Sequence, residues 1–303
     1  MIVPMTDLYL HPALPAFLTT PLAALGRCHR TLDKACEVVV VPGGLALSTQ
    51  WLDALPGLRL ISVFGVGYDG VPLDYCRSRQ IAVTNTPDVL TDDVADIATA
   101  LVLMTSRNLG EAERFTRAGR WLAGPLPLAH ALRGKTAGVL GMGRIGKAIA
   151  KRLEAHGMQL CYHGRRAQSD LPWRWCPSLL ELAEGSDFLV VACPGGAQTH
   201  HLVDAQVLAA LGPTGTLINI ARGSVVDTAA LITALQTGAI RAAGLDVYEQ
   251  EPQIPQALLD SPRCVLLPHV GSATHETRQA MADLVLANVK AYAGGQPLLT
   301  LVL

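Results

Sequence analysis

Short apolar runs alternate with amphipathic stretches along almost the whole chain. The runs are rich in leucine and β-branched residues and nearly continuous in apolar character, which is typical of strands covered on both faces. The expected strands are residues 38–41, 59–63, 81–85, 137–140, 160–163, 188–192, 217–220, 242–245 and 264–267. Helical periodicity lies between them, for example over residues 147–156, 178–184 and 228–236. This alternation predicts an α/β fold of parallel sheets with helices on both sides.

Two longer helical patterns predict where the chain passes between two domains. One runs from about residue 91 to 109, with Thr91 as the candidate N-cap, and the other from about residue 274 to 293. A length of 303 residues suits two domains of ordinary size. The predicted domains are residues 1–90 together with 273–303, and residues 91–272.

Composition narrows the class of partner. The 24 Lys and Arg residues balance the 25 Asp and Glu residues, which gives no reason to expect nucleic acid or an anionic membrane as partner. The seven cysteines form no CxxC pair, so we expect reduced thiols in a cytoplasmic protein and neither a disulfide framework nor a metal site. We expect neither a signal peptide nor a membrane span from the sequence.

A glycine-rich segment near the middle of the chain predicts a dinucleotide-binding loop. Gly141, Gly143 and Gly146 have GxGxxG spacing between a strand-like run and a helical pattern. The first glycine permits a tight turn, the second lets the backbone approach a pyrophosphate, and the third allows the helix to pack closely on the strand. The free N–H groups of the helix N-terminus then face the phosphates. The alternative is a plain glycine-rich turn.

The residues after the next expected strand indicate which nicotinamide cofactor is used. A site specific for NAD usually places Asp or Glu at the end of this strand. Here Gly164, Arg165 and Arg166 follow instead, and no acid occurs before Asp170. Because Arg makes charge-assisted contacts with phosphate, we predict NADPH as the preferred cofactor and NADH as a second one. The alternative is a solvated arginine pair on a surface turn.

Three polar residues follow separate strands of the second domain. Arg222 follows the run 217–220, Glu251 lies beyond the run 242–245, and His269 lies beyond the run 264–267. In open α/β sheets ligands bind outside the carboxyl ends of the strands, so we expect the three to converge there. Hydride addition to a ketone needs a proton donor, which suits His269 paired with Glu251, and a cation beside the carbonyl, which suits Arg222. Taken alone, Arg222 and Glu251 are more typical of surface or loop charges, and His269 is more typical of a structural histidine.

With these segments in order, the chain resembles the D-isomer-specific 2-hydroxyacid dehydrogenases along nearly its full length. The matching segments are FGVGYDGVPLDYCRSRQIAVTNTPDVLTDDVADIA, GVLGMGRIGKAIAKRL, LINIARGSVVDTAAL, GLDVYEQEP and LLPHVGSAT. The resemblance implies two Rossmann- or flavodoxin-like doubly wound parallel-sheet domains, with the coenzyme domain inserted in the substrate domain. It also implies a homodimer formed largely through the coenzyme domain.

The resemblance also assigns roles to single residues. It implies Arg222, Glu251 and His269 as the catalytic triad, with Arg222 and His269 also binding substrate. Backbone N–H groups of Val66 and Gly67 would hold the substrate carboxylate. The implied cofactor contacts, besides the glycine loop and the arginine pair, are Thr91, Arg144, Ile145, Cys193, Ala221, Asp246 and Gly271. Trp121 and Leu126 are candidate side-chain selectors for a neighbouring subunit's pocket.

The function predicted from these residues is NADPH-dependent reduction of glyoxylate, hydroxypyruvate or a similar small 2-keto acid to a D-2-hydroxy acid. One alternative is a dinucleotide-sensing binding protein, similar to a corepressor, on the same fold. Another is a dehydrogenase of a different donor, such as phosphite. The complete set of Arg222, Glu251 and His269 favours the reductase.

Overall fold

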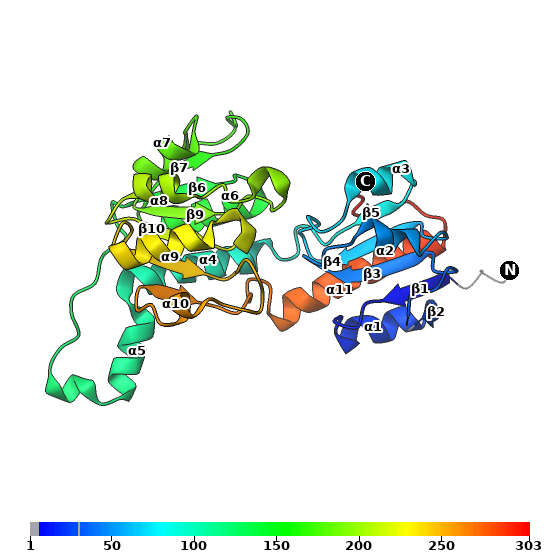
Figure 1. Cartoon of the computed structure of the whole chain (residues 1–303), viewed down its shortest axis with the longest axis horizontal. Helices are drawn as coiled ribbons and strands as arrows, with labels where there is room; N and C mark the ends of the chain where they lie inside the picture. The colour runs from blue at the N-terminus through cyan, green and yellow to red at the C-terminus, as the bar shows by residue number, and fades with distance from the viewer. Residues whose placement is uncertain (1–5, 30) are drawn as a thin grey trace. The chain divides into compact units, whose positions relative to one another are not determined.

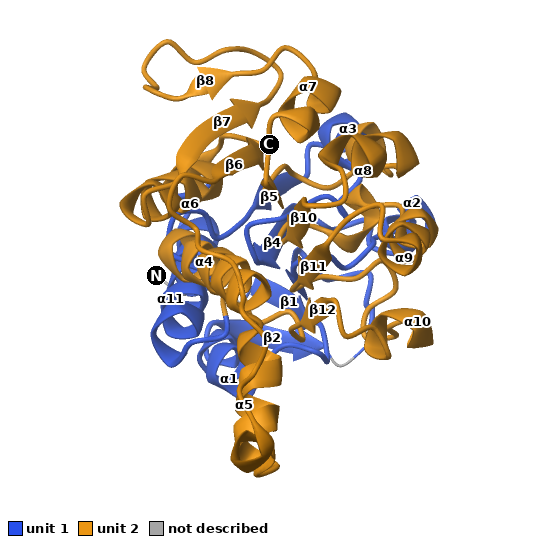
Figure 2. Cartoon of the chain, turned by 90° about the vertical axis from the view of Figure 1, so that its left-hand side faces the viewer, with its two compact units in different colours: residues 1–90, 273–303 blue, residues 91–272 orange. Residues whose placement is uncertain are grey.

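The computed structural model describes residues 6–29 and 31–303. The chain divides into two compact units, which Figure 2 colours separately. Unit 1 comprises residues 1–90 and 273–303, and unit 2 comprises residues 91–272. Each unit has a parallel β-sheet and a hydrophobic core of its own.

In the part of unit 1 that the structure describes, five parallel strands form a sheet in the order β2-β1-β3-β4-β5. The strands are β1 (Thr6–Leu10), β2 (Gly26–His29), β3 (Val38–Pro42), β4 (Leu60–Phe64) and β5 (Ala82–Thr84). The helices are α1 (Ala16–Ala23), α2 (Thr49–Asp53), α3 (Leu73–Ser78) and α11 (His275–Ala293). The helix α11 returns from the far end of the chain to pack against β4 and α1. This strand order is the flavodoxin-like form of the doubly wound fold.

Unit 2, whose residues are all described, has a seven-stranded parallel sheet in the order β12-β11-β10-β9-β6-β7-β8. The strands are β6 (Thr136–Leu140), β7 (Gln159–His163), β8 (Arg174–Trp175), β9 (Phe188–Val191), β10 (Thr216–Asn219), β11 (Ala242–Leu245) and β12 (Cys264–Leu266). The helices are α4 (Thr91–Arg107), α5 (Leu109–Arg117), α6 (Arg144–Ala155), α7 (Leu179–Glu184), α8 (Ala205–Leu211), α9 (Thr228–Thr237) and α10 (Gln256–Leu259). Short 3₁₀ turns lie at Arg120–Ala123, Ala197–Thr199 and Gly223–Val225.

Helices cover both faces of the unit 2 sheet (Figure 2). On one face α4 packs against α6 and against β10, β11 and β12, and on the other α7, α8 and α9 pack in a row. Every residue of β9, β10 and β11 is therefore buried, and the same holds for β4 in unit 1. The nearly continuous apolar runs reflect this double covering. The predicted class, an α/β fold of two doubly wound parallel sheets, is confirmed.

Polar side chains fix the starts of several helices. Ser178, Asp204 and Asp227 accept hydrogen bonds from backbone N–H groups in the first turns of α7, α8 and α9. Thr274 does the same for α11 by accepting from the N–H of Thr277. Such caps satisfy amide groups that have no partner within the helix. These caps therefore help to fix the loops that connect the strands to the helices.

Three details differ from the sequence prediction. Strands β1, β2 and β8 were not predicted, because β1 starts with the polar residues Thr6 and Asp7, β2 and β8 lie at sheet edges, and β8 has two residues. Thr91 is the first residue of α4 and not its N-cap. The predicted helix over 91–109 ends at Arg107, because Asn108 has a left-handed backbone (φ 50°) and α5 starts at Leu109.

All seven cysteines lie within the described ranges, and none of them forms a disulfide. Of the helices in residues 6–29 and 31–303, none combines the length and apolar character needed to cross a membrane.

Candidate functional site

The strand order of unit 2 reverses between β6 and β9, which are neighbours in the sheet. Ligands of doubly wound sheets bind at this point, outside the carboxyl ends of the strands. The predicted cofactor residues of unit 2 lie beyond strands β6, β7, β9, β10, β11 and β12, with Thr91 at the start of α4. Those beyond the strands are Gly141, Gly143, Arg144, Ile145, Gly146, Arg165, Arg166, Cys193, Ala221, Asp246 and Gly271.

The glycine loop joins β6 to α6 and needs its glycines for specific reasons. Gly141 has φ 97°, and a Cβ there would lie 2.5 Å from the backbone nitrogen of Cys193. A Cβ on Gly146 would lie 2.1 Å from the carbonyl oxygen of Gly141. At Gly143, the N-cap of α6, a Cβ would meet open space, and no side chain caps the helix. The N–H groups at the start of this 12-residue helix therefore suit a pyrophosphate.

The loop after β7 presents the two arginines to solvent. Arg165 and Arg166 are both exposed. The nearest acid along the chain, Asp170, forms an ion pair with Lys147 at 3.2 Å. The carboxylate at this strand end that NAD-specific sites use is absent from the loop, and two guanidinium groups stand in its place. The loop suits a cofactor that carries a phosphate on its adenosine ribose.

Gln168, which the sequence prediction missed, ties this arginine loop to the glycine loop. Its Nε2 donates to the carbonyl oxygen of Met142 at 2.8 Å, between Gly141 and Gly143. Its backbone N–H donates to the hydroxyl of Tyr162 at 2.8 Å. Tyr162 is 1% exposed, so one end of the linkage is anchored in the core.

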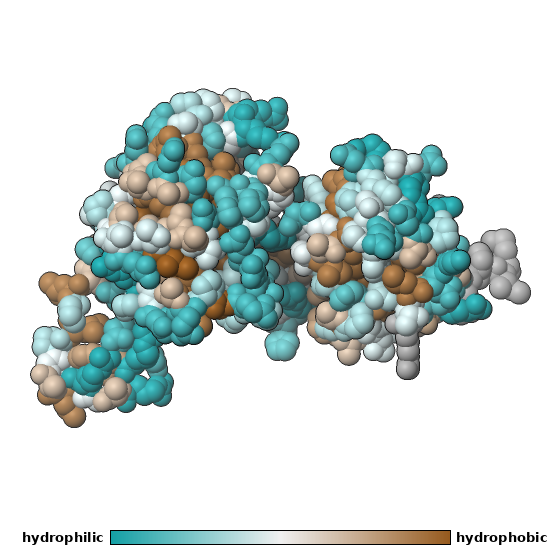
Figure 3. All heavy atoms as spheres, in the orientation of Figure 1, coloured by the Kyte–Doolittle hydropathy of each residue, from teal (hydrophilic) through white to brown (hydrophobic). Residues whose placement is uncertain are grey.

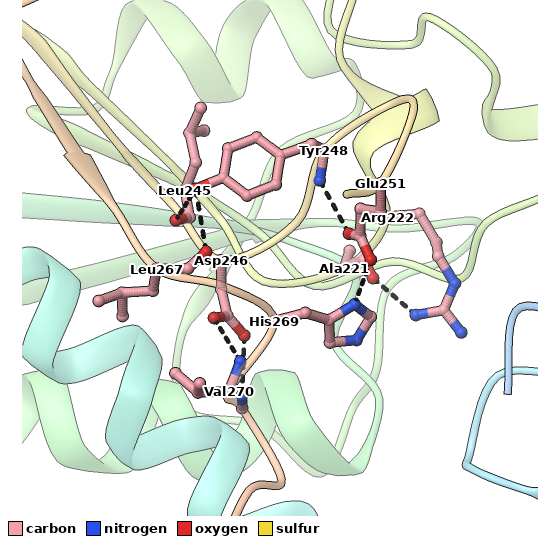
Figure 4. Close-up of polar contacts among 10 residues, drawn as sticks. Ala221, Arg222, Leu245, Asp246, Tyr248, Glu251, Leu267, His269 and Val270 are labelled. Carbon is pink, nitrogen blue, oxygen red and sulfur yellow. Dashed lines mark hydrogen bonds and ion pairs between the residues drawn. The ribbon is translucent and has the colours of Figure 1, made fainter. Parts of the chain in front are cut away.

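Arg222, Glu251 and His269 come together in unit 2, as Figure 4 shows. Nδ1 of His269 lies 2.7 Å from Oε2 of Glu251, and the backbone N–H of Tyr248 donates to Oε1 of Glu251 at 2.9 Å. Because a carboxylate only accepts, Nδ1 carries the proton and Nε2 is the other ring nitrogen. The guanidinium of Arg222 lies beside the same carboxylate and donates to the carbonyl oxygen of Ala221 at 2.8 Å.

The charges around Glu251 keep it ionised. Burial alone raises the pKa of Glu251. The hydrogen bonds from His269 and from the N–H of Tyr248, with the charges of His269 and Arg222, outweigh burial and hold that pKa below its ordinary value. A charged Glu251 orients the imidazole and stabilises its protonated form. His269 is itself exposed, so its ring is open to a reacting molecule.

Asp246 has a structural task at the same place. It is 2% exposed, and its two carboxylate oxygens accept from the N–H groups of Val270 and Gly271, each at 2.8 Å. Burial raises the pKa of Asp246, although these two hydrogen bonds lower it. The carbonyl oxygen of Asp246 also accepts from the N–H of His269 at 2.9 Å. Asp246 therefore fixes the turn that carries His269.

The smaller predicted residues line the strand ends. Cys193 and Ala221 are both buried, and burial raises the pKa of Cys193 to about 11, which suits a pocket lining and not a nucleophile. A Cβ on Gly271 would lie 3.1 Å from Oδ2 of Asp246. Arg144 and Ile145 form the first turn of α6.

Val66 and Gly67 belong to unit 1 and follow β4. The side-chain amide of Asn85 donates to the carbonyl oxygen of Val66 at 2.8 Å. Both residues are partly exposed, and the preceding Gly65 lies close to Gly43, since a Cβ on Gly65 would come within 2.9 Å of the Gly43 Cα. The hydrogen bond from Asn85 and the close approach of Gly43 thus support the loop after β4.

The sequence prediction also missed a cluster of side chains beside the triad. His200 and His201 from the loop after β9 meet Glu249 from the loop after β11. Glu249 is 48 residues from His201, and nothing in the spacing connects them. The sequence prediction included no metal site, whereas the structure brings these three potential metal ligands together.

Comparisons with known proteins show which family the chain resembles. Residues 99–271 match the family model for the D-isomer specific 2-hydroxyacid dehydrogenase, NAD binding domain. The chain is 47% identical over 285 residues to glyoxylate/hydroxypyruvate reductase A of Arabidopsis thaliana, which covers 94% of this chain and 90% of the relative. It is 45% identical over 267 residues to hydroxyphenylpyruvate reductase of Plectranthus scutellarioides, which covers 88% of this chain and 85% of the relative.

A solved structure extends the match to the whole fold. The NADPH-dependent glyoxylate/hydroxypyruvate reductase of Sinorhizobium meliloti, in complex with NADP and malonate, matches with a TM-score of 0.94 and 45% identity. The match covers 98% of this chain and 97% of that chain. The resemblance predicted from the sequence is therefore confirmed, and the chain belongs to the D-isomer specific 2-hydroxyacid dehydrogenase family.

Proposed function

We propose that this chain reduces small 2-keto acids to D-2-hydroxy acids with NADPH. The observation that carries the proposal is the hydrogen-bonded pair of Glu251 and His269 with the guanidinium of Arg222 beside it. These three groups lie beyond the carboxyl ends of strands in the unit that matches the NAD-binding family model. Glyoxylate and hydroxypyruvate, named in the relatives, are the first substrates to test.

The bound cofactor supplies the hydride, and the residues of the chain control the oxygen. As the carbonyl carbon gains the hydride, negative charge grows on the carbonyl oxygen, and Arg222 stabilises it. The imidazolium of His269 gives that oxygen the proton on Nε2, so an alcohol forms and the imidazole becomes neutral. Glu251 accepts the Nδ1–H throughout, which holds the ring in place and stabilises its protonated form. Solvent then returns the proton to Nε2.

NADPH fits the residues that the chain offers. The open space at Gly143 and the uncapped start of α6 suit the pyrophosphate. Arg165 and Arg166 would bind the 2′-phosphate, and NADH, which lacks it, would bind more weakly. Thr91, Arg144, Ile145, Cys193, Ala221, Asp246 and Gly271 are proposed as the other cofactor contacts.

In unit 1, the backbone N–H groups of Val66 and Gly67 are proposed to bind the substrate carboxylate. In unit 2, Arg222 and His269 are proposed to bind substrate, Arg222 through its positive charge. The malonate in the Sinorhizobium meliloti complex is a small carboxylate, which supports a site for such groups in the family.

We further propose a cytoplasmic homodimer formed largely through unit 2. In Figure 1, α5 and the residues after it extend away from the sheet of unit 2. Large apolar side chains on this segment are open to solvent: Trp121 is 69% exposed, Leu122 97% and Leu128 99%. Figure 3 shows hydrophobic atoms on the same segment. Apolar side chains this exposed are typical of a surface that a partner covers. The seven cysteines form no disulfides in the described residues, which supports a cytoplasmic location.

A substrate panel tests the function. NADPH absorbance is followed with glyoxylate, hydroxypyruvate and larger 2-keto acids, and kcat/KM is compared between NADPH and NADH. The proposal expects turnover with at least one 2-keto acid and a higher kcat/KM with NADPH. Absence of turnover with every 2-keto acid would favour a dinucleotide-sensing binding protein, and reduction of NADP+ by phosphite would favour the other dehydrogenase. Sedimentation of wild type beside Leu122→Ser tests the dimer.

A further inference from the structure

His200, His201 and Glu249 form a cluster of potential metal ligands that the proposed mechanism does not use. One ligand atom of each residue lies within 4.8 Å of those of the other two. Nε2 of His201 is 2.8 Å from Oε1 of Glu249. The two imidazole rings stack with their centroids 3.9 Å apart. Two loops of unit 2, one after β9 and one after β11, thus bring three donors together.

Neighbouring groups hold two of these donors in place. The backbone N–H of His201, which has a left-handed φ of 49°, donates to the carbonyl oxygen of Ser224 at 2.8 Å. Nε2 of His201 in turn lies 2.8 Å from Oε1 of Glu249, so the backbone bond that holds His201 also fixes the partner of Glu249.

We propose that His200, His201 and Glu249 bind one divalent transition-metal ion, with Zn²⁺ as the best match. Two imidazoles and one carboxylate are a ligand set that zinc takes, with water in the fourth position. Ligand atoms around tetrahedral zinc lie roughly 3.4 Å apart, so His201 and Glu249, now 2.8 Å apart, would separate slightly and His200 would approach them. The exposed side chain of His200 can rotate out of the stack to do so. Zinc then replaces the proton shared by His201 and Glu249.

The ion would act on the loop that carries Glu251, because Glu249 precedes Glu251 by two residues. Beneath this loop lies a cavity of about 290 Å³, lined by residues that include Tyr248, Gln250 and Gln253. The loop is thus incompletely packed from below. A metal link from Glu249 to the loop after β9 would stabilise it and raise the thermal midpoint of the protein.

Calorimetric titration with ZnCl₂ tests the site in a Cys28→Ser background, which removes the exposed thiol. We expect one Zn²⁺ per chain at pH 7.5, with affinity lowered about 10-fold or more in His200→Ala and in Glu249→Gln. His156→Ala, which removes an exposed histidine elsewhere in unit 2, is the matched control and should leave affinity unchanged.

Two results would overturn the metal proposal. One is the absence of saturable zinc binding to the Cys28→Ser chain. The other is binding whose affinity is the same in His200→Ala, Glu249→Gln and the background chain, because the zinc would then be held elsewhere. Neither result bears on the reductase proposal.

A second and independent observation concerns the link between the arginine loop and the glycine loop. Gln168 bonds the carbonyl oxygen of Met142 through its side chain and the hydroxyl of Tyr162 through its backbone. Lys147 of α6 and Asp170 form a second link between α6 and the arginine loop. We infer that Gln168 is a positioning residue that sets the preference for NADPH over NADH. This inference rests on the proposed cofactor.

The reason is geometric. The glycine loop would fix the pyrophosphate on O5′ of the adenosine ribose, and the arginines would fix the 2′-phosphate on the same ribose. Of the two links, only the side-chain hydrogen bond from Gln168 joins the arginine loop directly to the glycine loop, while Lys147 and Asp170 join it to α6. Without the Gln168 side chain, both arginines remain but the position of their loop is less well defined. Only a cofactor with a 2′-phosphate depends on that position.

The test compares KM for both cofactors in wild type and Gln168→Ala. We expect KM for NADPH to rise about 10-fold, because the displaced arginines would lose the equivalent of one hydrogen bond to the charged 2′-phosphate. KM for NADH and kcat should stay nearly unchanged. Gln168→Glu, which when ionised cannot donate to the Met142 carbonyl and adds a negative charge near the arginine loop, should raise KM for NADPH at least as much as Gln168→Ala. A rise in KM that is equal for both cofactors would overturn the inference. If wild type itself prefers NADH, the proposed cofactor fails instead.

Discussion

The two ends of the proposed cofactor site in unit 2 are built in different ways. At the catalytic end, Glu251 bonds both the imidazole of His269 and the N–H of Tyr248, and Arg222 lies beside it. At the other end, Arg165 and Arg166 are exposed, and Gln168 holds their loop from its base. The first end depends on contacts between the functional groups themselves. The second depends on the charge of the two arginines, and Gln168, which bonds to the glycine loop, positions the loop that carries them.

This difference predicts how each end responds to substitution. At the catalytic end, a variant that keeps the size of a side chain but changes its charge, or removes its ability to donate or accept a proton, should lose turnover. At the arginine end, the loss should appear in cofactor binding and should be partly restored by any positive charge. The predictions below separate the two, beginning with the largest effect.

Replacing His269 by Ala removes the proposed proton donor. We expect kcat to fall by about 10²–10⁴, the range typical of general acid–base catalysis. NADPH affinity, measured by quenching of tryptophan fluorescence, should change little. Near-normal turnover with glyoxylate or hydroxypyruvate would contradict the role of His269.

Replacing Arg222 by Ala removes the cation beside the carbonyl oxygen. We expect kcat/KM to fall by about 10²–10³, the loss typical of one oxyanion donor. KM should rise as well, because the same group would bind the substrate carboxylate. Arg222→Lys keeps the charge without the planar fork and should lie between wild type and Arg222→Ala. A loss confined to KM would restrict Arg222 to binding.

Replacing Arg165 and Arg166 together by Ala tests the other end. We expect KM for NADPH to rise about 10- to 100-fold, because contacts with a charged group are lost, while KM for NADH stays near wild type. Arg174→Ala is the matched control, since Arg174 is an exposed arginine paired with Glu181. An equal effect on both cofactors would show that the pair does not bind a 2′-phosphate.

The smallest effect concerns stability and pH. The folded pKa of Glu251 lies below its ordinary value of 4.5. Its ionised form therefore stabilises the fold at a pH above 4.5, and this stability is lost as pH falls through the lower, folded pKa. The difference in unfolding free energy between wild type and Glu251→Gln should shrink below pH 4.5. Glu184→Gln, an exposed control, should show no such trend; a difference that is independent of pH would contradict the prediction.

The sequence was sufficient for the elements that lie in the middle of each sheet. Strands such as β9 and β10 are buried on both faces, so their composition alone identifies them. Edge strands β2 and β8 carry polar residues and gave no such signal. The left-handed backbone at Asn108, which splits the expected helix, is a local event that periodicity cannot detect.

For the site, the sequence predicted residue types but not contacts. Arg222, Glu251 and His269 follow three different strands, and parallel topology alone puts them at one edge of the sheet. The pairing of His201 with Glu249 and the bond from Gln168 to Met142 depend on how loops of different length approach each other. No spacing rule connects those residues. They are found only once the fold is known.

The most direct test of the central claim is a double-mutant cycle on kcat with His269→Ala, Glu251→Gln and the double variant. If Glu251 acts by holding the imidazole of His269, the account predicts that Glu251→Gln lowers kcat in the wild-type background and changes it little once His269 is Ala. Equal, multiplicative losses in both backgrounds would contradict it, because Glu251 would then act independently of His269.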